Sequence, residues 1–310
     1  QKVRRIIGGD MKINERILKS IKSLPAFPIT VKKINRMISS PDYSARELAG
    51  VIKYDQSITA NILRMCNSAY FGLRHKVDNV QDAVLYLGRD NLVRAVLAAG
   101  ITRYFKKTKG YAVEGIDLWE HSVSVALMAQ ILSRKIYNHE NPKLFTAAIL
   151  HDVGKVVLGE YVCESCKKIK TLVSEKGYDF LEAEEEVLGI NHAQLGGEMA
   201  LLWNFPADIK DAIAYHHRPD MVRRKSNGLV WLVYLADQIC LMTGIGGGAD
   251  GLAYRGLKEA FDKFKLRQQD VEEAMVLLLK GMEDARDLLD IVPDKRSVPR
   301  TAPHERSLRY

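Results

Sequence analysis

The sequence predicts an all-α fold, and three observations support this prediction. Apolar residues recur at the three- and four-residue spacing of helices along most of the 310 residues. Several of these segments begin with helix-capping residues or end at glycine. Alternating apolar and polar residues joined by hairpin turns, which are typical of half-buried strands, are not evident. No fixed-period repeat stands out, so a solenoid is not expected.

The first helices are expected before residue 106. Pro28 stands at the start of an apolar-periodic segment, where its fixed φ suits the first helical turn. Ser44 and Glu47 form a capping-box pattern, and Gly88 is a typical helix end. The polar segment 106–115 is expected to join this first bundle to the rest. The predicted helices cover, in order, residues 29–38, 48–52, 57–67, 79–88 and 92–105.

The remaining helices are expected after residue 117. They cover residues 118–137, 143–150, 155–175, 180–187, 193–203, 206–216, 228–242 and 268–289. The segment 244–251 holds five glycines and predicts a flexible connection before the last helices. We therefore expect the following organisation: a leader or tail at 1–11, an N-terminal bundle at 12–110, a second bundle at 111–245, C-terminal helices at 246–292 and a basic tail at 293–310.

Composition and charge narrow the protein class. Apolar residues make up 47% and charged residues 27% of the chain, which excludes collagen, low-complexity disorder and disulfide miniproteins. Four cysteines do not suggest a disulfide framework, and no apolar stretch is long enough to span a bilayer, so a cytoplasmic protein without a membrane partner is expected. Most of the net charge of +8 lies in the two tails. Solvated tails explain this better than a specific nucleic-acid site.

Five histidines and two aspartates lie on or beside apolar helical segments. Placing such groups on apolar faces costs free energy unless they are paired or coordinate a metal. A single histidine of this kind is usually a hydrogen-bonded core residue, but the joint occurrence indicates a site. Imidazole and carboxylate ligands suit iron, manganese, zinc or nickel. The candidate metal ligands are His121, His151, Asp152, His192, His216, His217 and Asp237.

The order of these residues resembles a known superfamily. His121, the pair His151-Asp152 and Asp237 are similar to the ligands of the HD superfamily of metal-dependent phosphohydrolases. The further histidines are similar to those of HD-GYP cyclic-dinucleotide phosphodiesterases, which bind two or three metals. The GYP segment is absent, because Arg-Pro-Asp stands at 218–220.

Other strings resemble the HDOD family of bacterial signalling proteins over residues 24–242. They are Leu-Pro-Ala-Phe-Pro at 24–28, Asn-Ser-Ala-Tyr at 67–70, Ala-Val-Leu-Tyr-Leu-Gly at 83–88, His-Asp-Val-Gly-Lys at 151–155 and Trp-Asn-Phe-Pro at 203–206. The resemblance implies two packed helical bundles, the second HD-domain-like, and a regulatory role in signal transduction. Many members of this family have lost metal ligands, whereas this chain keeps an apparent ligand at every candidate position.

Two functions remain open. The first is a regulatory module with a structural metal site and other signalling proteins as partners. The second is a phosphohydrolase acting on a nucleotide or cyclic dinucleotide, in which Asp152 and Lys155 are catalytic. We favour the module, since no base-binding pocket is recognisable. We expect divalent metal but no nucleotide cofactor, because a phosphate-cradling glycine loop is absent.

The expected geometry of the site follows from the residue order. His121, His151, Asp152 and Asp237 should converge in one pocket of the second bundle. His192, His216 and His217 should line its mouth or supply a second ion.

Two other features have plainer interpretations. Cys163 and Cys166 are expected to be inert, partly exposed thiols, and the acidic run 182–186 is expected to be a solvated helix face.

Overall fold

The structure is a computed structural model, and part of the chain is described by it. The described residues are 11–23, 29–37, 44–54, 56–67, 76–105, 111, 115–222, 228–245 and 257–284. Several expectations fall elsewhere and lie outside the described residues: 1–10 of the N-terminal tail, the basic C-terminal tail, the motif at 24–28, residues 68–70 of the Asn-Ser-Ala-Tyr string, most of the connection at 106–115, most of the glycine-rich connection and the end of the last predicted helix.

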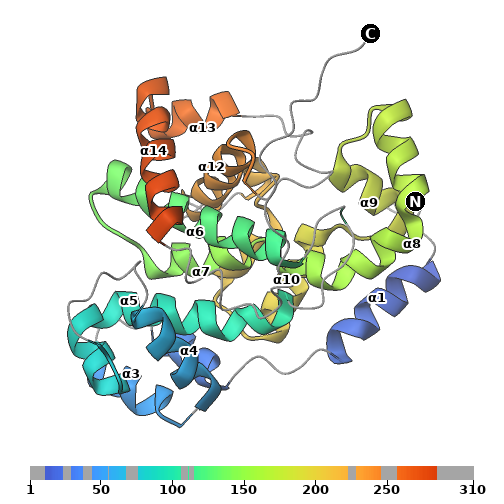
Figure 1. The fold of residues 1–310 in the computed structure, drawn as a ribbon. Coiled ribbons are helices and arrows are strands. Elements are labelled where there is room, and N and C mark those ends of the chain that lie inside the picture. The colour runs from blue at the N-terminus through green and yellow to red at the C-terminus, as the bar shows by residue number, and fades with distance from the viewer. Residues whose placement is uncertain are drawn as a thin grey trace, which may run out of the picture.

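Helices make up every regular element of the described residues, which confirms the all-α prediction (Figure 1). They are α1 (Met11–Ser23), α2 (Ile29–Met37), α3 (Ala45–Ile52), α4 (Gln56–Cys66), α5 (Val80–Phe105), α6 (Gly115–Tyr137), α7 (Pro142–Leu150), α8 (Val153–Lys176), α9 (Phe180–Leu188), α10 (His192–Leu202), α11 (Ala207–Ala214), the short 3-10 helix η3 (Pro219–Met221), α12 (Gly228–Met242), α13 (Leu257–Phe264) and α14 (Gln268–Asp284). Helices α1 and α13 were not among the predicted elements.

Two local signals determine helix ends in the first bundle. The Ser44 side chain accepts a hydrogen bond from the Glu47 amide, and Glu47 Oε2 accepts one from the Ser44 amide at 2.7 Å. This capping box satisfies two amides that the first turn of α3 would otherwise leave unpaired. Gly88 has φ 70° and ψ 176°, which breaks α5 into two helical parts. The predicted end at Gly88 is therefore a kink within one long element.

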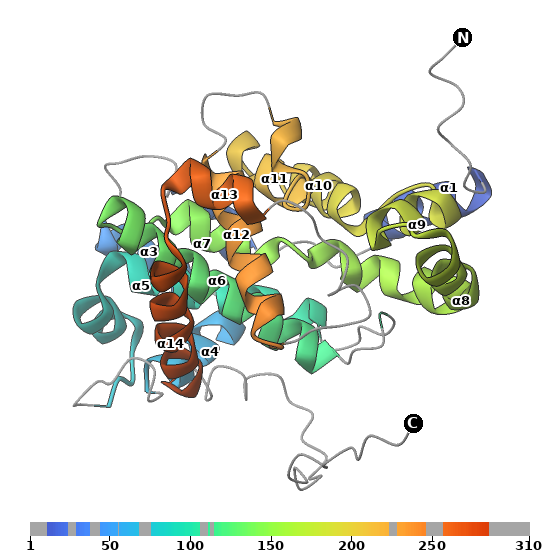
Figure 2. The same cartoon turned by 90° about the horizontal axis from the view of Figure 1, so that it is seen from above.

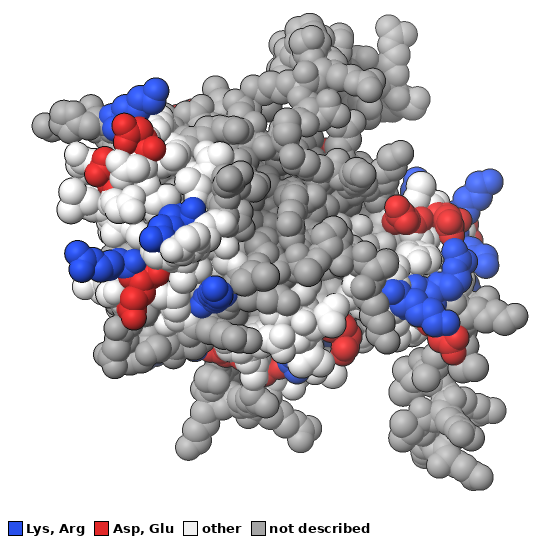
Figure 3. Space-filling model, turned by 90° about the horizontal axis from the view of Figure 1, so that it is seen from below, with Lys and Arg blue, Asp and Glu red and all other residues white. Residues whose placement is uncertain are grey.

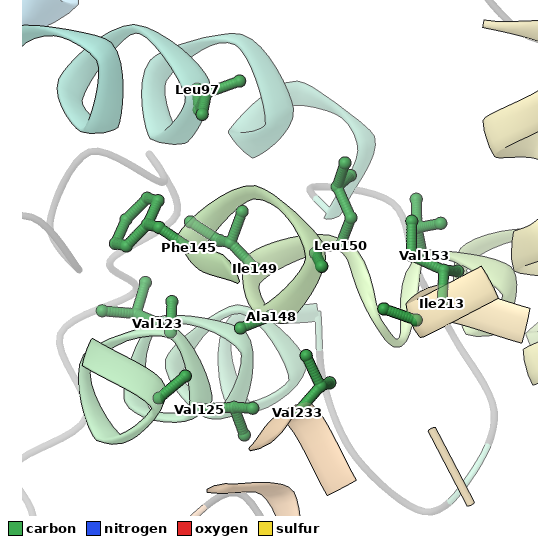
Figure 4. Close-up of a cluster of buried hydrophobic side chains, with 14 of the residues drawn as sticks. Leu97, Val123, Val125, Phe145, Ala148, Ile149, Leu150, Val153, Ile213 and Val233 are labelled. Atoms are coloured by element: carbon green, nitrogen blue, oxygen red, sulfur yellow. The ribbon is translucent and has the colours of Figure 1, made fainter. Parts of the chain in front are cut away.

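Helix α5 connects the two halves of the molecule. Helices α2, α3 and α4 pack against α5, which in turn packs against α6 and α7. Figure 4 shows Leu97 of α5 facing Phe145 and Ile149 of α7, with Val233 of α12 in the same apolar cluster. The apolar faces that the sequence period predicts therefore meet in a continuous core.

Helix α6 is central to the second half. It packs against α7, α12 and α14, while α10 packs against α8 and α11. Figure 2 shows α13 and α14 together on one side of this assembly. Every residue from Val230 to Cys240 of α12 is buried, including Asp237. None of the described helices is both long and apolar enough to cross a membrane.

Helix α1 packs against α8, although residues 12–110 were expected to form one N-terminal bundle. The Asn14 side-chain amide donates a hydrogen bond to the Gly189 carbonyl at 2.8 Å. The Arg16 guanidinium lies 5.7 Å from the centroid of the Tyr161 ring. The first residues of the range 12–110 therefore pack against the second half of the molecule.

Candidate metal centre

The structure brings all seven candidate ligands together from five places in the second half. His121 lies in the second turn of α6, and Asp237 lies within α12. The pair His151-Asp152 occupies the turn between α7 and α8, His192 begins α10, and the pair His216-His217 follows α11. Helix ends and tight turns therefore supply five of the seven residues, and buried helix interiors supply the other two.

Three glycines allow the helices that carry these residues to approach closely. A Cβ atom at Gly154 would lie 1.9 Å from the His192 carbonyl oxygen. One at Gly196 would lie 2.9 Å from the Ile213 side chain, and one at Gly197 would lie 2.7 Å from the Ala214 Cβ. These are contacts that a larger side chain could not make without moving backbone. The glycine of the His-Asp-Val-Gly-Lys string therefore sets the distance between α8 and α10.

The cluster is closed off from solvent. His151, His192 and His216 are 0% exposed, and the other four side chains are at most 4% exposed. Buried polar groups must find partners inside the protein or on a bound ion. The polar atoms of the cluster therefore have almost no access to bulk water.

Four of the imidazoles are oriented by a hydrogen bond at Nδ1. Each places Nδ1 against a protein oxygen that can only accept a hydrogen bond: His121 against the carbonyl of Ile245 (3.2 Å), His151 against that of Ala148 (2.7 Å), His216 against that of Ile213 (2.7 Å) and His192 against the carboxylate of Glu184 (2.8 Å). Nδ1 therefore carries the proton, and the Nε2 atoms face the cluster. Metal-binding histidines are typically oriented in this way.

The first group of ligand atoms surrounds His151. Its Nε2 lies 3.4 Å from Asp152 Oδ2 and 3.7 Å from Asp237 Oδ1. His121 Nε2 lies 3.0 Å from the same Asp237 oxygen. His121, His151 and Asp152 each place a ligand atom within 4.8 Å of the others. A divalent ion at this point would have nitrogen and oxygen donors on several sides.

A second group shares Asp152 with the first. Asp152 Oδ1 lies 3.5 Å from His192 Nε2 and 3.7 Å from His216 Nε2. His192 Nε2 also lies 3.0 Å from His217 Nε2. All four residues place ligand atoms within 4.8 Å of one another. The two carboxylate oxygens of Asp152 therefore face different groups, and each could serve as a ligand in its own group.

The electrostatics of the cluster favour ionised carboxylates. Burial opposes ionisation of Asp152, but Lys155 and His151 outweigh burial and hold its pKa well below the usual range. Burial likewise opposes ionisation of Asp237, but the hydrogen bond from His121 and the nearby His151 outweigh burial and keep its pKa well below the usual range. Both acids are therefore in the form that binds cations.

His151 differs from His216 and His217 in its protonation. Burial lowers the pKa of His151, but Asp152 and Asp237 outweigh it and raise this pKa to about 10. Burial lowers the pKa of His216 and lowers that of His217 strongly. The neutral imidazoles of His216 and His217 are therefore available as ligands.

The residues present fit a divalent metal. His151 Nε2, Asp152 Oδ1 and His216 Nε2 are buried without a hydrogen-bond partner. Such atoms are costly in an interior, and all three point into the cluster. A bound divalent cation would satisfy them together. Mixed imidazole and carboxylate donors suit zinc, iron, manganese or nickel.

Lys155 contacts the cluster through the carboxylate of Asp152. Its ammonium group donates a hydrogen bond to Asp152 Oδ2 at 2.7 Å and lies 5.5 Å from the centroid of the Tyr111 ring. The side chain is buried, which differs from a lysine on the surface of a first helical turn. Its charge is therefore directed at a candidate metal ligand.

Glu184 is a residue whose role the sequence interpretation missed. The run 182–186 was expected to be a solvated helix face, and this is wrong for Glu184, which is 0% exposed. It lies four residues after Phe180 and four before Leu188, on the apolar face of α9. That spacing was the available signal, because residues four apart share a helix face.

An open pocket of about 340 Å³ adjoins the cluster at His217. Tyr215, Arg218, Lys210 and Glu198 line it together with residues of α9 and α10. Arg218 and Glu185 lie 3.8 Å apart across part of this lining. The pocket is a polar recess next to one ligand, and the other six residues lie deeper.

Solved structures share this architecture. An HDOD domain protein of unknown function from Geobacter sulfurreducens is 25% identical, with a TM-score of 0.69 over 91% of this chain and 96% of that chain. A candidate signal transduction protein from Marinobacter aquaeolei is 21% identical, with a TM-score of 0.74 over 94% of this chain and 68% of that one. A candidate metal-dependent phosphohydrolase from Shewanella amazonensis is 17% identical, with a TM-score of 0.56 over 90% of this chain and all of that one.

Sequence comparison identifies the family of this chain. An uncharacterized protein of Treponema pallidum is 23% identical over 207 residues, which span 66% of this chain and 40% of that protein. The family model described as the HDOD domain matches residues 24–219, a region that includes six of the seven clustered residues. The chain therefore belongs to the HDOD domain family.

Proposed function

We propose that this chain is a bacterial signal-transduction module whose second bundle is organised by a structural centre of two divalent metal ions. The observation that carries the proposal is the closed donor set. The first group offers His121, His151, Asp152 and Asp237, and the second offers Asp152 with three histidines. Structural sites are closed by about four protein ligands, whereas catalytic sites keep an open position for water or substrate.

Burial supports the same proposal. The side chains of the ligands are at most 4% exposed, so a phosphodiester would have to displace protein atoms to reach an ion. Lys155 already directs its charge to Asp152 at 2.7 Å. In this proposal Lys155 neutralises part of the buried negative charge and leaves no cation in reserve for a substrate phosphate.

The second candidate function is a metal-dependent phosphohydrolase. It is favoured by the pocket beside His217, where Arg218 and Lys210 could hold a phosphate of a nucleotide or cyclic dinucleotide. A divalent ion supplies a Lewis acid and lowers the pKa of water when bound. In this alternative, Asp152 holds the ion and Lys155 stabilises phosphate charge.

One experiment separates the two functions. The purified chain is loaded with manganese, iron or zinc and assayed with a generic phosphodiester and with cyclic dinucleotides, beside Asp152→Ala. The module predicts bound metal, a higher melting temperature and turnover no greater than that of the variant. Turnover that disappears in both Asp152→Ala and His217→Ala would establish the hydrolase instead.

For partners, we propose other signalling proteins in the cytoplasm. Figure 3 shows basic and acidic side chains of the described residues interspersed on one face. Mixed charge of this kind suits a protein surface better than the phosphate backbone of a nucleic acid. Co-purification of a defined signalling protein that survives nuclease treatment would support this assignment, and capture of nucleic acid alone would contradict it.

A further inference from the structure

A buried hydrogen-bonded chain lies behind the second ligand group. Glu184 is 0% exposed and accepts hydrogen bonds from the His192 amide at 2.9 Å and from His192 Nδ1 at 2.8 Å. The Tyr111 hydroxyl donates a further bond to the other oxygen of Glu184. Both oxygens of this carboxylate are therefore occupied by donors, which is how a charged group is accommodated in an interior.

The partner of His192 differs from those of the other oriented histidines. His121, His151 and His216 donate Nδ1–H to backbone carbonyls. His192 donates to a carboxylate, which makes the opposite nitrogen a stronger electron donor. This nitrogen, Nε2, faces Asp152 and His217. The carboxylate therefore acts on the second ligand group and not on the first.

Tyr111 is held where it can maintain this arrangement. Its ring centroid lies 5.6 Å from that of Phe180 and 6.1 Å from that of His192, in an edge-on arrangement with the imidazole. The side chain is 3% exposed. Tyr111 lies between α5 and α6, so the connection between the two bundles contributes a contact to the site.

We infer that Glu184 is a positioning residue for the second metal ion, and that the Tyr111 hydroxyl fixes Glu184 in turn. The inference rests on the proposed metal centre. Glu184 selects the Nδ1–H tautomer of His192 and aims Nε2 at the ion shared with Asp152, His216 and His217. The ion held by His121, His151 and Asp237 does not depend on it.

The test compares Glu184→Ala, Glu184→Gln and Tyr111→Phe in the full chain. Glu186→Ala is the matched control, because Glu186 is an exposed glutamate on the same helix. Zinc binding is measured by competition with a chromophoric chelator. Here the second equivalent means the zinc bound at the second ligand group, whatever the order of filling. Glu184→Ala should weaken this equivalent about 10–100-fold and leave the other unchanged. Glu184→Gln keeps an oxygen acceptor and should restore most of the affinity. Tyr111→Phe should weaken the second equivalent about 2–10-fold.

A second readout reports the tautomer itself. Nitrogen-15 spectra of the metal-free protein should show His192 as the Nδ1–H form in the wild type and in Glu184→Gln, and as a mixture in Glu184→Ala. His192→Gln identifies the resonance. If Glu184→Ala does not fold, Tyr111→Phe and Glu184→Gln are the variants compared with the wild type.

Failure of this inference can be distinguished from failure of the proposed function. If the wild type binds no zinc, the proposed centre fails, while the nitrogen spectra still support or overturn the role of Glu184. The inference is overturned if Glu184→Ala or Tyr111→Phe leaves the His192 tautomer and the second equivalent unchanged. It is also overturned if both equivalents weaken equally.

Discussion

The two halves of this molecule have the same kind of apolar core but bury very different polar groups. Thr30 is the one buried polar side chain described before α6, whereas fifteen are described from α6 onward. The first half is held together by apolar area, which requires no ligand. The second half must satisfy buried imidazoles and carboxylates, and it does so fully only with cations. Its stability should therefore depend on metal, and that of the first half should not.

The largest expected effect is at the closest approach in the second half. Gly154→Ala would place a Cβ 1.9 Å from the His192 carbonyl oxygen, so α8 and α10 must separate. We expect a loss of about 3 kcal/mol or more in the free energy of unfolding, measured with urea. Gly50→Ala in α3 is the control in the first half. No atom lies within 4 Å of its added Cβ, and a gain of about 0.5–1 kcal/mol is expected. Equal stability of Gly154→Ala and wild type would contradict the packing argument.

Metal removal should distinguish the halves directly. With a chelator, amide hydrogen exchange should accelerate in α10, α11 and the turn at 151–152, and remain unchanged in α3 and α4. Bound ligand at 100 times its dissociation constant stabilises the native state by about 2.7 kcal/mol, so the change is measurable. Equal acceleration of amide exchange in α3 and α4 would show that bound metal stabilises both halves alike.

The pH dependence of the metal-free protein gives a smaller effect with a defined sign. The pKa of His151 is raised to about 10 because Asp152 and Asp237 outweigh burial. The charged His151 side chain therefore stabilises the folded state fully below the pKa of about 6.5 that it has in the unfolded chain. This stabilisation is lost as the pH rises toward about 10. The stability difference between wild type and His151→Gln should be larger at pH 6 than at pH 9.

A surface histidine provides the comparison for that measurement. His139 is exposed and lies outside the cluster. His139→Gln is the control variant, because it removes an imidazole that contacts none of the cluster residues. If the stability difference between wild type and His151→Gln instead grew with pH, the predicted sign would be wrong.

The smallest expected effect is in the first half. Ser44→Ala removes the side chain that accepts from the Glu47 amide at the start of α3. N-cap losses of this kind cost about 1 kcal/mol. Urea unfolding should show this loss with chelator and without it, since the cap has no contact with the metal centre. A loss that appears only in the presence of metal would show coupling between the halves.

Much of the fold could be predicted from helical periodicity. Capping residues located helix starts, and Gly88 located the kink within α5, because these signals act within a few residues. Helix α1 was missed, although Ile17 and Ile21 are buried four residues apart. Its packing against α8 depends on contacts such as Asn14 with Gly189, which are 175 residues apart and leave no local pattern. The division of the chain into domains stays a prediction.

The candidate site was predictable in its residue types but not in its supporting contacts. Histidines and aspartates on apolar helices are visible in a sequence, because burial of such groups needs a reason. The carbonyls of Ile245 and Ala148 that orient imidazoles are not visible, since any residue has a carbonyl. Glu184 was hidden among neighbouring acids of the same run, and its partner His192 lies in another helix.

The most direct test of the central claim is the metal content of the purified chain and two variants, by elemental analysis after loading with iron, manganese or zinc. The two ligand groups predict two ions per chain in the wild type. Asp152 faces both groups, so Asp152→Ala should lose both ions, whereas Asp237→Ala should lose the ion of the first group and keep the other. A wild-type protein that takes up none of these metals and melts at the same temperature with chelator would contradict the account.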